Sequence, residues 1–251
     1  MRRALLVSLV ALLAALLLDS GLAAAQTPVP SLSIGIDSAE TPQEVAVSLQ
    51  ILFLLTVLSL APAILVMTTS FTRIIVVLSF VRTALSTNQT PPNQVLIGLA
   101  LFMTFFVMAP TWMEVYEEAL QPYLAGEIAQ EEALARAAEP VREFMFRHTR
   151  ERDLALFIEM SGGERPVDPS DVGTEALIPA FIISELKSAF QMGFVLFVPF
   201  IVIDMIVAST LMSMGMLMLP PVMISLPFKI LLFVLVDGWY LVARSLLVGY
   251  Q

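Results

Sequence analysis

The sequence contains no cysteine and only one histidine, His148. Disulfide frameworks, cysteine metal sites and thiol catalysis are therefore excluded, and one histidine alone cannot build a histidine-based metal site. Charged residues are also scarce, at 14% of the 251 residues, whereas 58% are hydrophobic and the mean hydropathy is +0.86. The apolar residues come in long runs rather than in the alternation of a half-buried surface, so the composition indicates an integral membrane protein.

Motifs of the common enzyme classes are missing as well. The sequence has no H-E-x-x-H, no G-x-S-x-G, no P-loop and no G-x-G-x-x-G. An intramembrane aspartyl protease would need two partnered aspartates, and the two candidates, Asp204 and Asp237, each have basic residues nearby in the sequence. We therefore expect neither catalysis nor a cofactor or metal.

The N-terminus has the pattern of a secretory signal peptide. Arg2 and Arg3 precede an apolar run at 4–18, and small residues follow up to Gln26. The run is about 15 residues long, short of the roughly 20 that cross a bilayer. We predict cleavage after residue 25, which leaves Gln26 on the outer side of the membrane; an uncleaved anchor is the alternative.

The rest of the chain divides by composition. Uncharged runs at 45–67 and 95–113 are long enough to span a bilayer, and a shorter apolar run between them is bracketed by Arg73 and Arg82. The expected fold class is an all-α membrane protein of long, kinked helical hairpins with a small helical extracytoplasmic insert. The expected segments are a signal peptide at 1–25, a flexible lead at 26–44, apolar helices with a cytoplasmic-side turn at 45–113, the acidic insert at 114–175, and apolar helices with a Met/Pro loop at 176–251.

The insert at 114–175 carries 15 acidic and 6 basic residues, a net charge of −9. Its apolar residues recur at helical spacing around His148, which we place at an interface or in a small core. Pro140 fits a helix start and Gly162 with Gly163 fits a stop. Arg73 and Arg82 place the first loop in the cytoplasm by the positive-inside rule, so the insert is expected outside, in agreement with the signal peptide.

Charges inside the apolar runs are costly in lipid and usually face protein or water. Asp204 lies 12 to 13 residues before the centre of a break at 216–217, and Lys229 lies equally far after it. On the two arms of a hairpin these side chains would be level and could pair; the alternative is that each has another partner or contacts water. The buried charges that we predict are Glu185, Lys187, Asp204, Lys229, Asp237 and Arg244.

Two polar stripes are also predicted. Lys229, Asp237 and Arg244 would fall within an arc of about 80° on one continuous helix. Three smaller groups, Ser184, Ser188 and Gln191, recur at i, i+4 and i+7 on the preceding helix. Such stripes pack against partners or line a conduit, although plain helix–helix contact explains the smaller groups equally well.

Methionines alternate just before a double proline, at Met212, Met214, Met216 and Met218. In an extended segment alternate side chains share one side, and Gly215 and Pro220 argue for such a break in the helix. Methionine is long, apolar and flexible, so several copies of this loop could close a pore and still yield to a passing chain. Ordinary apolar filler is the alternative interpretation.

Several long runs resemble the FliP family of flagellar type III export-gate proteins. They are P-A-I-L-V-M-T-T-S-F-T-R at 62–73, the stretch at 89–108, F-V-P-F-I-V-I-D-M at 197–205 and M-G-M-L-M-L-P-P at 214–221, followed by L-P-F-K at 226–229 and V-D-G-W at 236–239. The resemblance covers nearly everything from Val45 onward and weakens in the acidic insert and the lead.

The resemblance implies an all-helical subunit, present in several copies and expected as a pentamer, that assembles with FliQ and FliR in the bacterial inner membrane at the flagellar basal body. Exported flagellar polypeptides would pass through the channel, and no nucleic acid is implied. Many apolar helices would then be buried in protein rather than in lipid. The implied gate loop falls at Met216, Leu217 and Met218, where Leu217 interrupts the usual methionine triplet.

Two other functions stay open from the sequence. A homologous gate subunit of a virulence injectisome is the first, although the signal peptide and the large insert favour the flagellar branch. A secondary transporter that uses Asp204 as an ion site is the second, and the absence of inverted repeats counts against it.

Overall fold

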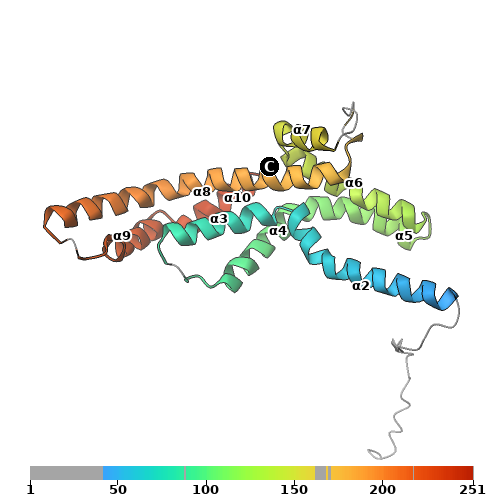
Figure 1. Ribbon diagram of the computed structural model, residues 1–251, viewed down its shortest axis with the longest axis horizontal. Coiled ribbons are helices and arrows are strands. Elements are labelled where there is room, and N and C mark those ends of the chain that lie inside the picture. The colour runs from blue at the N-terminus through green and yellow to red at the C-terminus, as the bar shows by residue number, and fades with distance from the viewer. Residues whose placement is uncertain (1–41, 88, 162–167, 169–170, 217, 251) are drawn as a thin grey trace, which may run out of the picture. The chain divides into compact units, whose positions relative to one another are not determined.

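The structure is a computed structural model that describes residues 42–87, 89–161, 168, 171–216 and 218–250. The expected signal peptide and most of the lead lie outside these residues. The described part of the chain is all-α, as the composition predicts. In chain order its helices are α2 (Pro42–Thr68), α3 (Phe71–Ala84), α4 (Asn93–Val115), the π-helical turn η1 (Tyr116–Leu120), α5 (Gln121–Leu124), α6 (Gln130–His148), α7 (Glu151–Met160), α8 (Thr174–Ser213), α9 (Pro221–Leu235) and α10 (Gly238–Val248) (Figure 1).

The chain divides into two compact units, at 1–52 and 53–251. In the first unit the structure describes the start of α2, from Pro42 to Leu52. Of the described residues, the second unit contains the remainder of α2, the other helices and two hydrophobic cores, one around Ile74 of α3 and one around Phe144 of α6 and Phe181 of α8.

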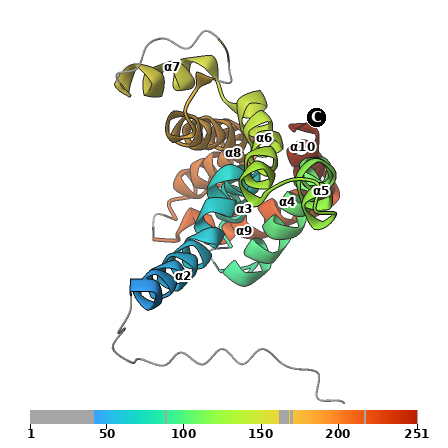
Figure 2. The ribbon, with the colours of Figure 1, turned by 90° about the vertical axis from the view of Figure 1, so that its right-hand side faces the viewer.

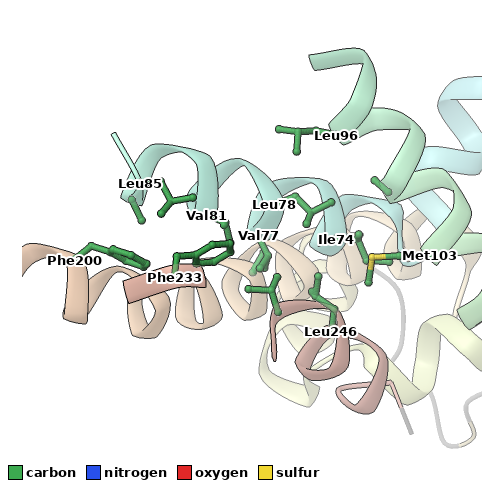
Figure 3. Packing of buried hydrophobic residues seen from close by; sticks show 14 residues of the cluster. Ile74, Val77, Leu78, Val81, Leu85, Leu96, Met103, Phe200, Phe233 and Leu246 are labelled. Atoms are coloured by element: carbon green, nitrogen blue, oxygen red, sulfur yellow. The ribbon is translucent and has the colours of Figure 1, made fainter. Parts of the chain in front are cut away.

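Helix α3 lies at the centre of the larger core. Its apolar residues follow helical spacing, at Ile74, Val77, Leu78 and Val81, and all four are almost fully buried. Figure 3 shows them facing residues from several other helices, among them Leu96 and Met103 of α4, Phe200 of α8, Phe233 of α9 and Leu246 of α10. One short amphipathic helix therefore joins helices that are distant in the sequence.

Helix α8 is the longest element, with 40 residues. At 1.5 Å per residue it is about 60 Å long, twice the roughly 30 Å of a bilayer's hydrocarbon core. Figure 1 shows α3 and α9 along its length, and Figure 2 shows α7 lying across it rather than along it. The helix ends at Ser213, and α9 begins at Pro221, so the predicted break before the double proline is present.

Among the described residues, three helical stretches are long and apolar enough to cross a membrane, at Ser48–Thr68, Asn93–Leu124 and Thr174–Ser213. The pair α9 and α10 would make a fourth if it is one bent span, since its helices differ in direction by 62°. Several hydroxyl groups on these helices donate a hydrogen bond to a backbone carbonyl of the same helix; for example, Thr210 donates to the carbonyl of Ile206 at 2.8 Å. Such bonds satisfy polar groups without water, which suits an apolar surrounding.

One local expectation is wrong. Pro140 does not start a helix but lies inside α6, which begins ten residues earlier at Gln130, so the helix loses a backbone hydrogen bond there. The acidic insert predicted to begin at Glu114 does not begin with a new helix, because α4 continues through η1 into α5. Gly162 and Gly163 lie outside the described residues, and α7 ends before them at Met160.

The last apolar stretch is not the single helix that its hydropathy predicts. Asp237 has φ 52°, in the left-handed region, and separates α9 from α10. Left-handed backbone in one residue ends the helical repeat, because its carbonyl and amide no longer point along the axis. A Cβ at Gly238 would meet the ring of Phe233, so glycine is required for the close packing at this bend.

Candidate functional site

An ion pair joins the two arms of the α8–α9 hairpin. Lys229 is 1% exposed, and its Nζ donates to Oδ2 of half-buried Asp204 at 2.6 Å. The hydroxyl of Ser225, one turn before Lys229, donates to Oδ1 of Asp204 at 2.5 Å. The structure thus brings together the two charges that sequence spacing placed level on a hairpin, and does so within one chain.

A third element takes part in this pair. Lys229 Nζ also donates to the hydroxyl of Ser86 at 2.8 Å. Ser86 directly follows the end of α3 and has φ 58°, an uncommon backbone region that the surrounding contacts must hold. The lysine therefore fixes the end of α3 to both arms of the hairpin.

The turn beyond the ion pair carries the methionines. Met212 lies in the last turn of α8, Met214 caps the helix, and Gly215 at φ +74° reverses the backbone. The side chains of Met212, Met214, Met216 and Met218 are 61%, 59%, 42% and 98% exposed in the single chain. Leu217 lies outside the described residues. The tip of the hairpin is thus an apolar, flexible surface that this chain does not cover itself.

A second polar group lies in the first half of α8, around Glu185, whose burial the sequence predicted but whose partners it did not. Glu185 is fully buried and forms an ion pair with Arg73 of α3, whose Nε donates to Oε2 at 3.0 Å. Arg73 Nη1 donates to the carbonyl of Gly249 at 3.0 Å, and the hydroxyl of Tyr250 donates to Glu185. We call these groups the Arg73–Glu185 knot; it ties the C-terminus to α3 and α8.

Arg73 and Glu185 are 112 residues apart in the sequence, so no local spacing predicts that they pair. The only signal of this pair was negative: Arg73 and Glu185 each lie at or in an apolar run without an opposite charge at helical distance. Burial, and then repulsion by the Glu185 carboxylate, raises the pKa of Tyr250, so its hydroxyl stays protonated and able to donate.

His148 packs against this knot. Its ring centroid lies 4.7 Å from that of Phe144 and 4.9 Å from that of Tyr250, and the Arg73 guanidinium lies over the Tyr250 ring. Burial, and then the charges of Arg73 and Arg147, lowers the pKa of His148 from 6.5 to about 4. The histidine is thus a neutral aromatic member of a small core, in keeping with the position predicted for it.

The insert is fastened to α8 by polar bonds at the start of α7. The backbone N–H of Arg150 donates to the Ser184 hydroxyl at 3.0 Å, and this hydroxyl donates to Oδ2 of Asp153 at 2.9 Å. Lys187 forms an ion pair with Asp153. Although burial raises the pKa of Asp153, hydrogen bonds from Lys187 and Ser184 outweigh it and hold that pKa below its ordinary value.

The predicted polar stripe on α8 is the surface that receives Arg150. Its Nη2 donates to the hydroxyl of Ser188 at 3.2 Å and to Oε1 of Gln191 at 2.7 Å. All three residues of the stripe, Ser184, Ser188 and Gln191, thus bind Arg150 of the insert.

The six charges predicted to be buried divide evenly. Glu185 and Lys229 are buried and Asp204 is half-buried, whereas Lys187, Asp237 and Arg244 are exposed in the single chain. The single charged stripe is wrong as well, because the break at Asp237 puts Lys229 on α9 and Arg244 on α10, two helices bent by 62°. Within the described residues no three metal-ligating side chains come close enough to hold an ion.

Comparison with known proteins gives one consistent result. The sequence model of the FliP family matches residues 54–246. The chain is 58% identical to the flagellar biosynthetic protein FliP of Bacillus subtilis over 86% of this chain and 98% of that protein. It is 48% identical to the protein of the same name from Caulobacter vibrioides, over 100% of this chain and 92% of the relative. The corresponding protein of Aquifex aeolicus is 46% identical, over 94% and 97% of the two chains. The chain therefore belongs to the FliP family.

Proposed function

We propose that this chain is a pore-forming subunit of the flagellar type III protein export gate. The relatives are named as flagellar biosynthetic proteins, which supports a role in the flagellar export apparatus and favours it over a virulence injectisome. The observation that carries the pore-forming role is the exposed methionine turn at the tip of a hairpin that an internal ion pair holds in place.

The exposed apolar surface supports assembly into an oligomer. Only 11% of the most apolar stretch of α8 is buried within the chain. Exposed apolar area of this extent needs lipid or protein to cover it. Several copies around an axis, joined by FliQ and FliR, would bury it and bring the methionine turns together at the centre.

The position in the membrane follows from charge. Arg73 and Arg82 lie near the two ends of α3, whereas the insert at 114–175 has a net charge of −9. The positive-inside rule therefore puts the loop after α2 on the cytoplasmic side of the inner membrane and the insert on the periplasmic side.

Met214, Met216 and Met218 would form the constriction of this pore. Their side chains are exposed and apolar, and an apolar constriction excludes ions because it favours dewetting. Thioether side chains rotate freely, so the same constriction can widen around a passing polypeptide. The Asp204–Lys229 pair would keep the two arms of the hairpin in register while the tip yields.

Ion conductance tests the gate. Replacing Met214, Met216 and Met218 by alanine shortens three side chains per copy, so cells that overproduce the complex should leak small ions and grow poorly, while export of flagellar subunits persists. Met205→Ala is the matched control, because Met205 is also an exposed methionine of α8 but lies two turns before the tip. Unchanged conductance from a fully assembled triple variant would return these methionines to the status of apolar filler.

Copurification tests the assembly. The full-length chain should elute with FliQ and FliR as one particle that contains several copies of the chain, and a particle image should show them around a central axis. A monodisperse single copy without these partners would contradict the proposal.

A further inference from the structure

An open groove lies between α8 and α10. It consists of two adjoining hollows of about 280 and 320 Å³ that share Val195, Leu196 and Val242 as lining residues. The first hollow also contains Gln191 and Ser245, whereas the second is lined by aliphatic and aromatic side chains, glycine and Pro199. The groove therefore changes along its length from partly polar to apolar.

The face of α8 shows the same gradient. Ser184, Ser188, Gln191, Val195 and Pro199 fall within an arc of about 80° at 3.6 residues per turn. The first three hold Arg150, and the last two line the apolar hollow. The Arg150 side chain therefore lies at the polar end of the α8–α10 groove, and the apolar hollow begins next to it.

Arg150 has capacity left for an anion. Its residue surface is exposed, and its side chain donates only to the uncharged groups of Ser188 and Gln191. No carboxylate of the described chain lies within ion-pair distance of its guanidinium. The neighbouring Asp153 already forms an ion pair with Lys187, and its other oxygen accepts from Ser184, so its carboxylate does not occupy the donors of Arg150.

We propose that the α8–α10 groove binds an anionic phospholipid, with the phosphate at Arg150 and an acyl chain along Val195 to Phe200. Arginine suits this role because its planar fork can donate two hydrogen bonds to one phosphate. The orientation also fits a bilayer: Arg150 belongs to the polar insert, and the hollow extends from there along an apolar helix. The site does not depend on the proposed pore and would exist in an unassembled subunit.

Lipid retention tests the site. The full-length protein, with whatever partners copurify, is reconstituted in nanodiscs with equal amounts of phosphatidylglycerol and phosphatidylcholine, then extracted and weighed by native mass spectrometry. The wild type should retain phosphatidylglycerol over phosphatidylcholine by roughly tenfold, because both lipids have a phosphate but the choline cation of phosphatidylcholine cancels its negative charge near Arg150. Equal retention of the two lipids would overturn the proposal.

Two variants separate the head from the tail of the site. Arg150→Gln should abolish the preference, whereas Arg152→Gln, which removes an equally exposed arginine of the same turn, should leave it intact. Val195→Trp should fill the groove and lower the retention of both lipids, whereas Val202→Trp, at an exposed position of α8 outside the groove, should not. An Arg150→Gln protein that still prefers phosphatidylglycerol would show that the site is not there.

A second copy of the chain is the competing occupant. The sequence has no cysteine, so Val195→Cys gives a single thiol in the groove. If lipid fills the groove, the Val195→Cys protein should stay monomeric under oxidation, because its thiol meets no second thiol. Disulfide-linked dimers or a specific cross-link to another subunit would mean that protein fills the groove, and the proposal would fail.

Discussion

The two halves of α8 differ in how much the chain itself covers. Eight buried positions lie in the half from Thr174 to Gly193, but only Phe200 and Leu211 are buried in the half from Phe194 to Ser213. The first half is fixed by the Arg73–Glu185 knot and by hydrogen bonds with Arg150 and Asp153 of the insert. The second half has α9 and the end of α3 beside it, and one ion pair, Asp204–Lys229. The first half of α8 is therefore part of a folded core, whereas most of the second half is exposed in the single chain and needs lipid or another subunit to cover it.

The difference shows what each ion pair does. In the first half the knot is dry, and its charges have partners on three segments, so it specifies how the helices pack. In the second half Asp204 is partly exposed, and the pair mainly fixes the register of two hairpin arms. Breaking the first should therefore damage folding, and breaking the second should damage assembly and export more than folding.

The largest expected effect is on the knot. Arg73→Ala or Glu185→Ala leaves one charge buried without its partner, which typically costs about 3–5 kcal/mol. Unfolding of the purified protein in detergent by denaturant measures the loss. Arg136→Ala is the control, because its pair with Glu132 is exposed and the change should be nearly neutral. A knot variant as stable as this control would contradict the view that the first half is an independent core.

The hairpin pair comes next. Asp204→Ala and Lys229→Ala should each abolish motility, because each leaves the other charge without its partner in an apolar hairpin. The double alanine variant should be less harmful than the two single changes predict, and exchanging the two residues should restore some motility if they pair directly. Arg244→Ala, at an exposed position within α10, is the control. If the exchange is as inactive as either single change, direct pairing loses its support.

The stability of the folded half should also depend on pH, through His148. The pKa of His148 falls from 6.5 to about 4 in the fold, so between these pH values the unfolded chain binds the proton more readily. Stability contributed by neutral His148 is therefore complete above pH 6.5 and is lost as the pH falls toward 4. His148→Gln cannot titrate, and its stability curve should be flatter over this range. Superimposable curves would contradict the assigned environment; no second histidine confuses the comparison.

The smallest effect is expected at an exposed ion pair of the insert. Glu143→Gln removes a pair with Arg147 whose two side chains are 58% and 62% exposed. Such pairs contribute about 1 kcal/mol or less, and less still at high salt. Denaturant unfolding at low and high salt should therefore show a small difference that shrinks with salt. A loss as large as that of the knot variants would mean that the insert is integral to the core.

The sequence could predict features whose partners are local or symmetric about a turn. Asp204 and Lys229 were placed together because both arms of a hairpin have equal length from its tip. The break at Gly215 to Pro220 was predictable because those residues disfavour helix. The bend at Asp237 was missed although Asp-Gly is a turn signal, since the surrounding hydropathy favoured one continuous span.

Other features depend on contacts that no spacing encodes. The Arg73–Glu185 knot needs α3, α8 and the C-terminus to meet, and only the packed structure brings them together. Burial of Asp237 and Arg244 was expected from the cost of charge in lipid, but that argument cannot tell one chain from an assembly. Their exposure here is a property of the single chain.

The length of α8 has a mechanical consequence. From Glu185 in the knot to Ser213 the helix is about 42 Å long, so a tilt of roughly 7° at the knot would move the methionine tip by about 5 Å. That displacement is about the width of an extended polypeptide backbone between neighbouring strands. A small adjustment where the insert, the C-terminus and α3 meet would thus be amplified at the opposite end of the molecule, with no local rearrangement of the tip itself.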